Sequence, residues 1–127
     1  MLCHMCGIIG YTGNTDALPV LIRGLRALEY RGYDSAGVAV TREGGIDAVK
    51  AVGRIDALER KLAEHPLRGT CGIGHTRWAT HGRPSEVNCH PHLSYGGKFA
   101  IVHNGIIENY ADIARKCAER GVTPAGD

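Results

Sequence analysis

Hydrophobic and polar positions follow two different periods along this chain, and each period predicts one kind of element. Residues 5–12 form a short apolar run that ends in a Gly-Asn pair, which is typical of a strand. Over residues 16–30, leucines and isoleucines recur at helical spacing, which predicts an amphipathic helix. Thr15 or Asp16 can cap the start of this helix, because both side chains can accept a hydrogen bond from the first turn.

The middle of the chain alternates between the two periods again. Residues 35–41 and 46–53 predict two strands, and the Glu-Gly-Gly sequence between them favours a tight hairpin turn. Residues 55–64 return to the helical period, and a His-Pro pair ends that helix.

The last part of the chain predicts two strands, a long loop and a helix. Residues 70–78 and 98–105 are strand-like, whereas residues 79–93 are polar, contain two prolines and show no period. Residues 106–120 predict a final helix with one apolar face. The side chains expected to point inward are Ile106, Ile107, Tyr110, Ile113 and Cys117.

The predicted order is strand-helix-strand-strand-helix-strand-strand-helix. Because this order contains a hairpin, it predicts a mixed or antiparallel sheet covered by helices and argues against a doubly wound nucleotide-binding fold. A length of 127 residues allows one domain at most.

Composition excludes several classes of partner. Lys and Arg number 15 against 13 Asp and Glu, and the net charge of +2 is too small and dispersed to indicate nucleic acid or an anionic membrane. No apolar run approaches the roughly 20 residues that span a bilayer, and we expect no signal peptide. The five cysteines are odd in number and lack framework spacing, which favours a reduced, cytoplasmic protein.

Cys6 is the first candidate for chemistry, because it follows a second methionine, Met5. If the residues before it are removed, Cys6 carries an α-amine with a pKa of about 7.7–8.0, which can act as base for its own thiol in acyl transfer. Asn104 and Gly105 offer an amide and an unobstructed N–H to an oxyanion. The alternatives are a cysteine packed in a strand and a common Asn-Gly turn.

Arg77 is the candidate for binding a substrate carboxylate, because its guanidinium can form two parallel hydrogen bonds. Thr80 and His81 can add donors beside it, and Trp78, the only tryptophan, can act as a lid. The alternative is a surface arginine stacked on an aromatic ring.

A metal site is a competing interpretation of the cysteines and histidines. Zinc favours four such ligands in a closed site, but the spacings here match no familiar finger pattern. The Gly-Ile-Gly at residues 72–74 is no dinucleotide fingerprint, because it lacks the third glycine. The candidate metal ligands are Cys3, His4, Cys6, His75, His81, Cys89, His90 and His92.

Four segments, in this order, resemble a known family. They are CGIIG at 6–10, EYRGYDSAG at 29–37, HTRWATHG with PSEVNCHPH at 75–92, and VHNGIIENY at 102–110. The segments are similar to the glutaminase domains of glutamine–fructose-6-phosphate aminotransferases (isomerising), which are class II glutamine amidotransferases and N-terminal nucleophile hydrolases. The resemblance extends from about residue 5 to 121. The second-best match is the glutaminase domain of amidophosphoribosyltransferases, which differ in the aromatic and polar pattern of two segments.

The resemblance implies catalytic roles for four residues. Cys6 would be the nucleophile that attacks the side-chain amide of glutamine, with its own α-amine as base. Asn104 and Gly105 would hold the oxyanion, and Arg31 would lie beside the nucleophile and steady the site.

The resemblance also implies a substrate-binding loop and a fold. Arg77, together with Thr80 and His81, would bind the carboxylate end of glutamine, and Trp78 would help to close the site and gate the path of ammonia. The implied fold class is α+β, a four-layer αββα sandwich of which this chain holds only the N-terminal part.

The activity implied by the resemblance is hydrolysis of L-glutamine to glutamate and ammonia. An isomerase domain missing from this chain would use the ammonia to convert fructose 6-phosphate to glucosamine 6-phosphate. No metal or organic cofactor is implied. The full-length protein would be a cytoplasmic homo-oligomer with no nucleic-acid or membrane partner.

The sequence departs from the family pattern at both ends. The family begins Met-Cys, so we expect residues 1–5 to be an extra leader or alternative start and residues 6–127 to be the amidotransferase domain. The family also carries an aspartate in a Thr-Asp-Thr-Glu stretch, which would lie just beyond residue 127 of this chain. Asp127 is not that residue. We therefore expect a truncated domain that is weakly active or inactive by itself.

Overall fold

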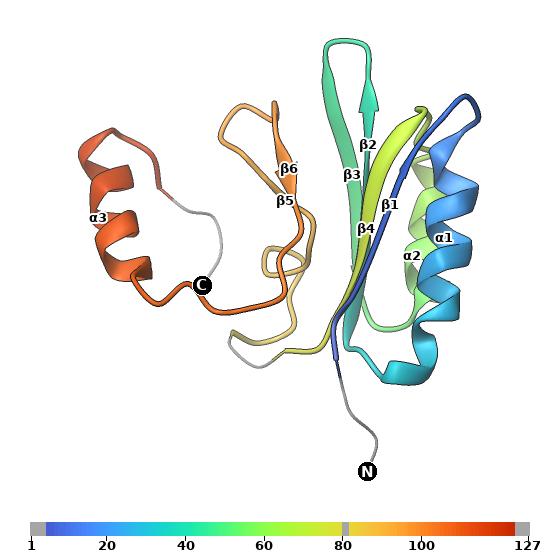
Figure 1. The fold of residues 1–127 in the computed structure, drawn as a ribbon, viewed down its shortest axis with the longest axis horizontal. Coiled ribbons are helices and arrows are strands. Elements are labelled where there is room, and N and C mark those ends of the chain that lie inside the picture. Colours follow the sequence, from blue (N-terminus) through green and yellow to red (C-terminus); the bar gives the residue numbers. More distant parts are fainter. Residues whose placement is uncertain (1–4, 80–81, 124–127) are drawn as a thin grey trace.

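A computed structural model describes residues 5–79 and 82–123 of the chain (Figure 1). The strands are β1 (Gly7–Thr12), β2 (Ser35–Arg42), β3 (Gly45–Val52), β4 (Cys71–Arg77), β5 (His92–Leu93) and β6 (Ala100–Ile101). The helices are α1 (Ala17–Ala27), α2 (Ile55–Glu64) and α3 (Tyr110–Glu119), with a short 3-10 helix, η1 (Glu29–Arg31), after α1. No helix of this described part is long and apolar enough to cross a membrane.

The main sheet has the strand order β1-β4-β2-β3, and every neighbouring pair is antiparallel, as the hairpin in the sequence predicted. The β2–β3 hairpin closes where Arg42 pairs with Gly45, and Gly44 takes a φ of 82°, which glycine adopts without strain. Strands β5 and β6 form a separate two-stranded antiparallel sheet.

Helices α1 and α2 cover one face of the main sheet (Figure 1). Asp16 caps α1 by accepting a hydrogen bond from the backbone N–H of Leu18. Strand residues alternate between the two faces of a sheet, so every second side chain of β2 meets the helices. The fully buried side chains between helices and sheet are Leu21, Leu25, Val38, Val40, Ile55 and Leu58.

The opposite face of the sheet is covered by the irregular segment of residues 82–105. Gly37 of β2 allows the close approach, because a Cβ at this position would lie 2.1 Å from the carbonyl oxygen of His90. Lys50 of β3 donates a hydrogen bond from Nζ to the carbonyl oxygen of Cys89 at 3.0 Å, and Cys89 is fully buried. The segment is therefore fixed to the sheet by backbone contacts and needs little regular structure.

Several predicted elements differ in extent. The last helix spans Tyr110–Glu119 instead of residues 106–120. The first helix ends at Ala27 and continues as η1, and the predicted strand over residues 98–105 is regular only at Ala100–Ile101. Strand β5 lies in the predicted loop, where it pairs with β6. Short pairings of this kind depend on the partner strand, which a local pattern does not reveal.

The prediction that α3 faces inward is wrong for the described structure. Ile106, Ile107, Tyr110 and Ile113 are 66%, 52%, 70% and 42% exposed, and α3 has no buried residue. Figure 1 shows α3 apart from the main sheet. The apolar stripe is present in the sequence, but no element among the described residues packs against it.

Candidate functional site

One end of the main sheet brings the distant sequence segments together. Because neighbouring strands are antiparallel, β1 and β2 start at the end where β4 finishes. Gly7 pairs with Thr76, and Ser35 pairs with Arg77. Residues just before β1 and just after β4 are therefore neighbours, although about seventy positions separate them in sequence.

Cys6 lies immediately before β1, and its thiol is held against the backbone of Trp78. The Trp78 N–H donates to Cys6 Sγ at 3.3 Å, and Sγ in turn lies 3.7 Å from the Trp78 carbonyl oxygen. The next peptide is fixed as well, because the Gly7 N–H donates to Thr76 Oγ1 at 3.1 Å. Cys6 is half-buried, so the structure does not support the alternative of a cysteine packed in the core.

Asn104 approaches Cys6 from the far end of the chain. Its Nδ2 donates to the Cys6 carbonyl oxygen at 3.4 Å, and its Oδ1 lies 2.7 Å from Nε2 of His75. Gly105 follows with a φ of 157°, and a Cβ there would come within 3.0 Å of the His103 ring. The Asn104 amide is thus a hydrogen-bond donor directly beside the candidate nucleophile.

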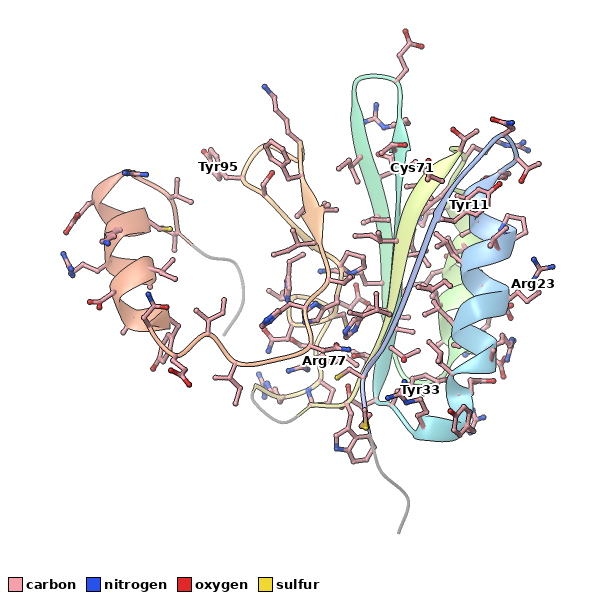
Figure 2. The ribbon with its side chains drawn as sticks, viewed as in Figure 1. Tyr11, Arg23, Tyr33, Cys71, Arg77 and Tyr95 are labelled. Carbon is pink, nitrogen blue, oxygen red and sulfur yellow. The ribbon has the colours of Figure 1, made fainter. Side chains whose placement is uncertain are left out.

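Arg77 is the last residue of β4 and lies on the face opposite the helices (Figure 2). Its side chain is only 8% exposed, and Nη2 donates to the carbonyl oxygen of Gly82 at 3.1 Å. Trp78, the next residue, is 36% exposed. The buried guanidinium of Arg77 therefore places a fixed positive charge at this end of the sheet, beside the exposed ring of Trp78.

Three histidines line the same face. The ring of His75 stacks on that of His90 with a centroid distance of 4.3 Å, and His92 meets His90 edge-on at 4.3 Å. Burial lowers the pKa of all three, and the nearby His75, His92 and Arg77 help to lower that of His90 to about 3. The cluster is therefore neutral at physiological pH, and Arg77 supplies the positive charge next to it.

Asp34 and His75 take part in this site, although neither was predicted from the sequence as a catalytic or substrate-binding residue. Asp34 Oδ2 accepts a hydrogen bond from the Ala79 N–H at 2.5 Å, and the Asp34 N–H donates to the Arg77 carbonyl oxygen at 2.8 Å. Asp34 thereby sets the path of the chain after β4. The available signal was an acidic residue directly before β2, in the motif over residues 29–37.

The remaining predicted site residues are not brought into the same network. Arg31 ends η1, and among the described residues its side chain makes no hydrogen bond or ion pair with Cys6 or any other group. Thr80 and His81 lie outside the described residues. The roles of these three residues remain predictions.

The structure gives the metal interpretation no support. Over residues 5–79 and 82–123, no group of three cysteine, histidine or carboxylate side chains is arranged to hold a metal ion. His75 stacks on His90 and His92 meets His90 edge-on, whereas metal ligands point their nitrogen atoms at one centre. Cys3, His4 and His81 lie outside the described residues.

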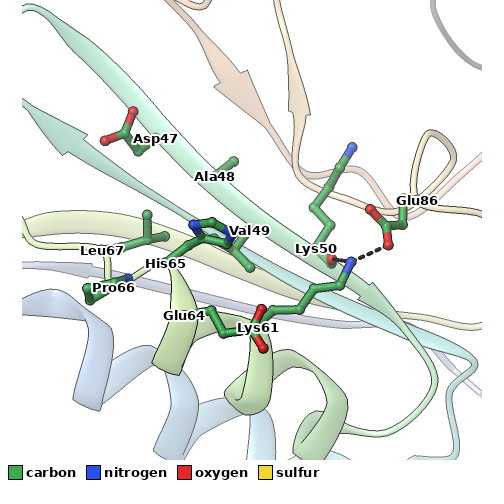
Figure 3. Close-up of a pocket in the computed structure, with 10 residues that line it drawn as sticks. All are labelled: Asp47, Ala48, Val49, Lys50, Lys61, Glu64, His65, Pro66, Leu67 and Glu86. Carbon is green, nitrogen blue, oxygen red and sulfur yellow. Dashed lines mark hydrogen bonds and ion pairs between the residues drawn. The ribbon is translucent and has the colours of Figure 1, made fainter.

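A cavity of about 600 Å³ lies away from Cys6, at the opposite edge of the sheet (Figure 3). It is bounded by β3, the end of α2 and Glu86, and Lys61 donates across it to the Lys50 carbonyl oxygen at 3.1 Å. None of the predicted site residues lines this cavity.

Comparison with known proteins points to one family, although no family model matches the chain. The chain is 57% identical over 118 residues to glutamine–fructose-6-phosphate aminotransferase (isomerising) of Streptomyces coelicolor. It is 55% and 52% identical over 117 residues to the proteins of the same name from Caldanaerobacter subterraneus and Thermus thermophilus. Each alignment covers 92% of this chain and 19% of the relative, so the chain spans about a fifth of their length.

Solved structures agree on the fold. The chain matches glutamine phosphoribosylpyrophosphate amidotransferase of B. subtilis, complexed with ADP and GMP, with a TM-score of 0.72 and 27% identity. It matches a structure of the allosteric regulatory enzyme of purine biosynthesis with a TM-score of 0.75 and 28% identity. Each match covers 90% of this chain and 25% of the other.

These findings confirm the predicted α+β fold class. They also separate the two candidate families, because identity to the aminotransferases is about twice the identity to the amidophosphoribosyltransferase type of structure. They show that the chain has the fold of the solved glutamine amidotransferase structure, and that over 92% of its own length it is similar in sequence to about a fifth of the length of the glutamine–fructose-6-phosphate aminotransferases (isomerising).

Proposed function

We propose that this chain hydrolyses the side-chain amide of L-glutamine, with Cys6 as the nucleophile. The observation that carries the proposal is the meeting of three distant segments at one point. The Cys6 thiol lies 3.3 Å from the Trp78 N–H, and the Asn104 amide donates to the Cys6 carbonyl oxygen at 3.4 Å. The candidate nucleophile, the Cys6 thiol, is thus on the same residue to which the Asn104 amide donates. That amide is the proposed donor to the oxyanion.

The proposed reaction has two halves. Cys6 Sγ attacks the amide carbon, the thiol proton passes to the base, and the carbonyl oxygen becomes an oxyanion stabilised by Asn104 Nδ2 and the Gly105 N–H. The carbon–nitrogen bond then breaks, and the nitrogen takes the proton and leaves as ammonia. Water cleaves the resulting thioester, which gives glutamate and restores the thiol.

The base in this proposal is the α-amine of Cys6. An α-amine has a pKa of about 7.7–8.0, so a useful fraction is neutral near pH 7.5. Such an amine exists only if residues 1–5 are removed, so we propose that they form a leader or alternative start and that the domain begins at Cys6. With residues 1–5 retained, the same nitrogen is an amide and cannot act as base.

Substrate binding is assigned to the charged end of the sheet. Arg77 would hold the glutamine carboxylate, since a buried guanidinium in a neutral environment attracts an anion strongly. Trp78 would flank the substrate, and Thr80 and His81 would add donors. Arg31 would steady the same end of the sheet from η1.

For the longer protein we propose the activity named by its relatives. The ammonia would be used on a domain outside this chain to convert fructose 6-phosphate to glucosamine 6-phosphate, in a cytoplasmic homo-oligomer. The 127-residue chain alone is proposed to be a poor glutaminase.

The test is selective labelling of the thiol. The purified chain is first checked by intact mass and N-terminal sequencing, with a second preparation that begins at Cys6. Both are treated with a diazoketone analogue of glutamine and mapped by mass spectrometry. In the preparation that begins at Cys6, we expect one label, on Cys6, that free glutamine suppresses and that is lost in Cys6→Ala, whereas Cys117→Ala labels normally. A preparation that keeps residues 1–5 should be labelled more slowly, because it lacks the α-amine. Label spread over Cys71, Cys89 and Cys117, or a stoichiometric metal in elemental analysis, would contradict the proposal.

A further inference from the structure

The Asn104 amide has to present the correct end to Cys6. An asparagine side chain can turn by half a rotation and exchange its oxygen and NH₂ with little change in shape. Only the NH₂ can stabilise an oxyanion, because the oxygen is an acceptor. Asn104 is exposed and lies in an irregular segment after β6, so neither burial nor regular structure fixes its orientation.

His75 contacts the other end of the same amide. Its Nε2 lies 2.7 Å from Asn104 Oδ1, while Asn104 Nδ2 donates to the Cys6 carbonyl oxygen. If His75 Nε2 carries a proton, it can pair only with an oxygen, and the NH₂ is left to face Cys6. In the reversed amide, two donors would oppose each other at His75 and two acceptors at Cys6.

The surroundings of His75 place the proton on Nε2. The residue is fully buried in β4, and its Nδ1 has no hydrogen-bond partner within the part of the chain that the structure describes. A proton on Nδ1 would leave a buried donor unpaired, which is unfavourable, whereas a proton on Nε2 reaches Asn104. Burial also lowers the pKa of His75, which keeps the ring neutral with a single proton.

A second histidine fixes the neighbouring backbone. His90 stacks on His75, and its Nδ1 accepts a hydrogen bond from the His103 N–H at 3.4 Å. One histidine therefore holds the peptide before Asn104, and the other holds its side chain.

We propose that His75 is a positioning residue that orients the Asn104 amide, so that Nδ2 points to the oxyanion at Cys6. The proposal rests on the proposed glutaminase function, in which Asn104 stabilises the oxyanion. His75 itself touches neither the thiol nor the substrate; it acts through Asn104 Oδ1.

The first measurement is the tautomer of His75 in the unmodified chain. Nitrogen-15 NMR of the imidazole should show a neutral ring with the proton on Nε2 and a bare Nδ1. A proton on Nδ1, or a charged ring at pH 7.5, overturns the proposal without any variant. This result does not depend on whether Cys6 reacts.

Two variants then separate positioning from packing. His75→Gln can keep a donor near the position of Nε2 but loses the stacked ring, whereas His75→Phe keeps the ring but has no donor. The readout is the rate of Cys6 labelling by the diazoketone analogue divided by the rate with iodoacetamide, which needs no oxyanion donor. His65→Gln and His65→Phe, at the exposed end of α2, are the matched controls.

We expect His75→Phe to lower this ratio at least about tenfold and His75→Gln to stay within about threefold, since loss of one oxyanion donor typically costs about 10²–10³ in rate. His75→Phe should add nothing in an Asn104→Ala background. A higher ratio of labelling rates in His75→Phe than in His75→Gln assigns His75 a packing role and overturns the proposal. If Asn104→Ala lowers the ratio and His75→Phe does not, only the role of His75 fails; if Asn104→Ala has no effect, the proposed role of Asn104 fails first.

Discussion

The two faces of the main sheet are built from the same strands, but only one of them carries buried charged and histidine side chains. Toward α1 and α2, the sheet presents Val38 and Val40, which meet Leu21 and Leu25 in a fully buried apolar layer. Toward residues 82–105, the alternate positions mix apolar residues, such as Ala39 and Ile73, with several polar side chains. They include Ser35, Lys50, His75 and Arg77.

The difference shows that one face of the sheet mainly stabilises the fold, whereas the other carries the candidate functional groups. The helix face gains free energy from buried apolar area and contributes no reactive group. On the other face, Arg77 and His75 are buried under residues 82–105, and His90 and His92 of that segment are half-buried against them. This burial costs desolvation free energy and lowers the pKa of each histidine. Even Lys50 has its pKa lowered by burial on this side.

The largest effect should come from the helix face. Leu25→Ala removes a fully buried side chain and should lower the free energy of unfolding by about 2–5 kcal/mol, measured by urea denaturation. Ile113→Ala in α3 is the matched control, because that side chain is 42% exposed, and it should change stability by less than about 0.5 kcal/mol. Equal losses would show that α3 packs against something in solution.

The second-largest effect should come from disturbing the contact between residues 82–105 and the main sheet. Gly37→Ala places a Cβ 2.1 Å from the His90 carbonyl oxygen and should cost about 1–3 kcal/mol by overpacking. Because the displaced segment carries Asn104, labelling of Cys6 by the glutamine analogue should slow as well. Gly10→Ala on β1 has no atom within 4 Å of the added Cβ and should leave both measurements unchanged.

A third prediction concerns charge at the polar face. Arg77→Lys keeps the charge but loses the planar pair of donors, so the concentration of glutamine analogue at half-maximal labelling should rise about tenfold, equivalent to about 1.4 kcal/mol. The rate with iodoacetamide should be unaffected. Arg68→Lys at an exposed position provides the control, and an equal response of the two variants would argue against a carboxylate site at Arg77.

The smallest effect should be a pH dependence confined to the polar face. In the folded chain, burial and the neighbouring His75, His92, Arg77 and His103 lower the pKa of His90 from 6.5 to about 3. Between these values the unfolded chain binds more protons, so the free energy of unfolding should fall as the pH falls from about 6.5.

His90→Phe should make this decline shallower, because it keeps a stacked ring that does not titrate. Urea denaturation at pH 7.5 and pH 5 measures the difference, and His65→Phe is the control at an exposed histidine. A decline that His90→Phe leaves unchanged would mean that other groups cause it.

The local hydrophobic pattern was sufficient to predict an element wherever that element depends only on its own residues. The helix over residues 55–64 has the predicted bounds, and the hairpin between β2 and β3 turns at its predicted glycines. It was insufficient where an element depends on a partner, as for the two-residue strands β5 and β6. It was wrong for the apolar stripe of α3, which predicted burial although no described element packs against that helix.

The sequence by itself indicated the kind of chemistry, because Cys6, Arg77 and Asn104 lie in motifs whose order along the chain resembles one family. Only the tertiary structure decided that Cys6 meets Trp78 and Asn104, since antiparallel pairing sets which strand ends adjoin. It also decided the part played by Asp34 and His75. Their contacts join residues 45 and 29 positions apart, and no local period carries information over such distances.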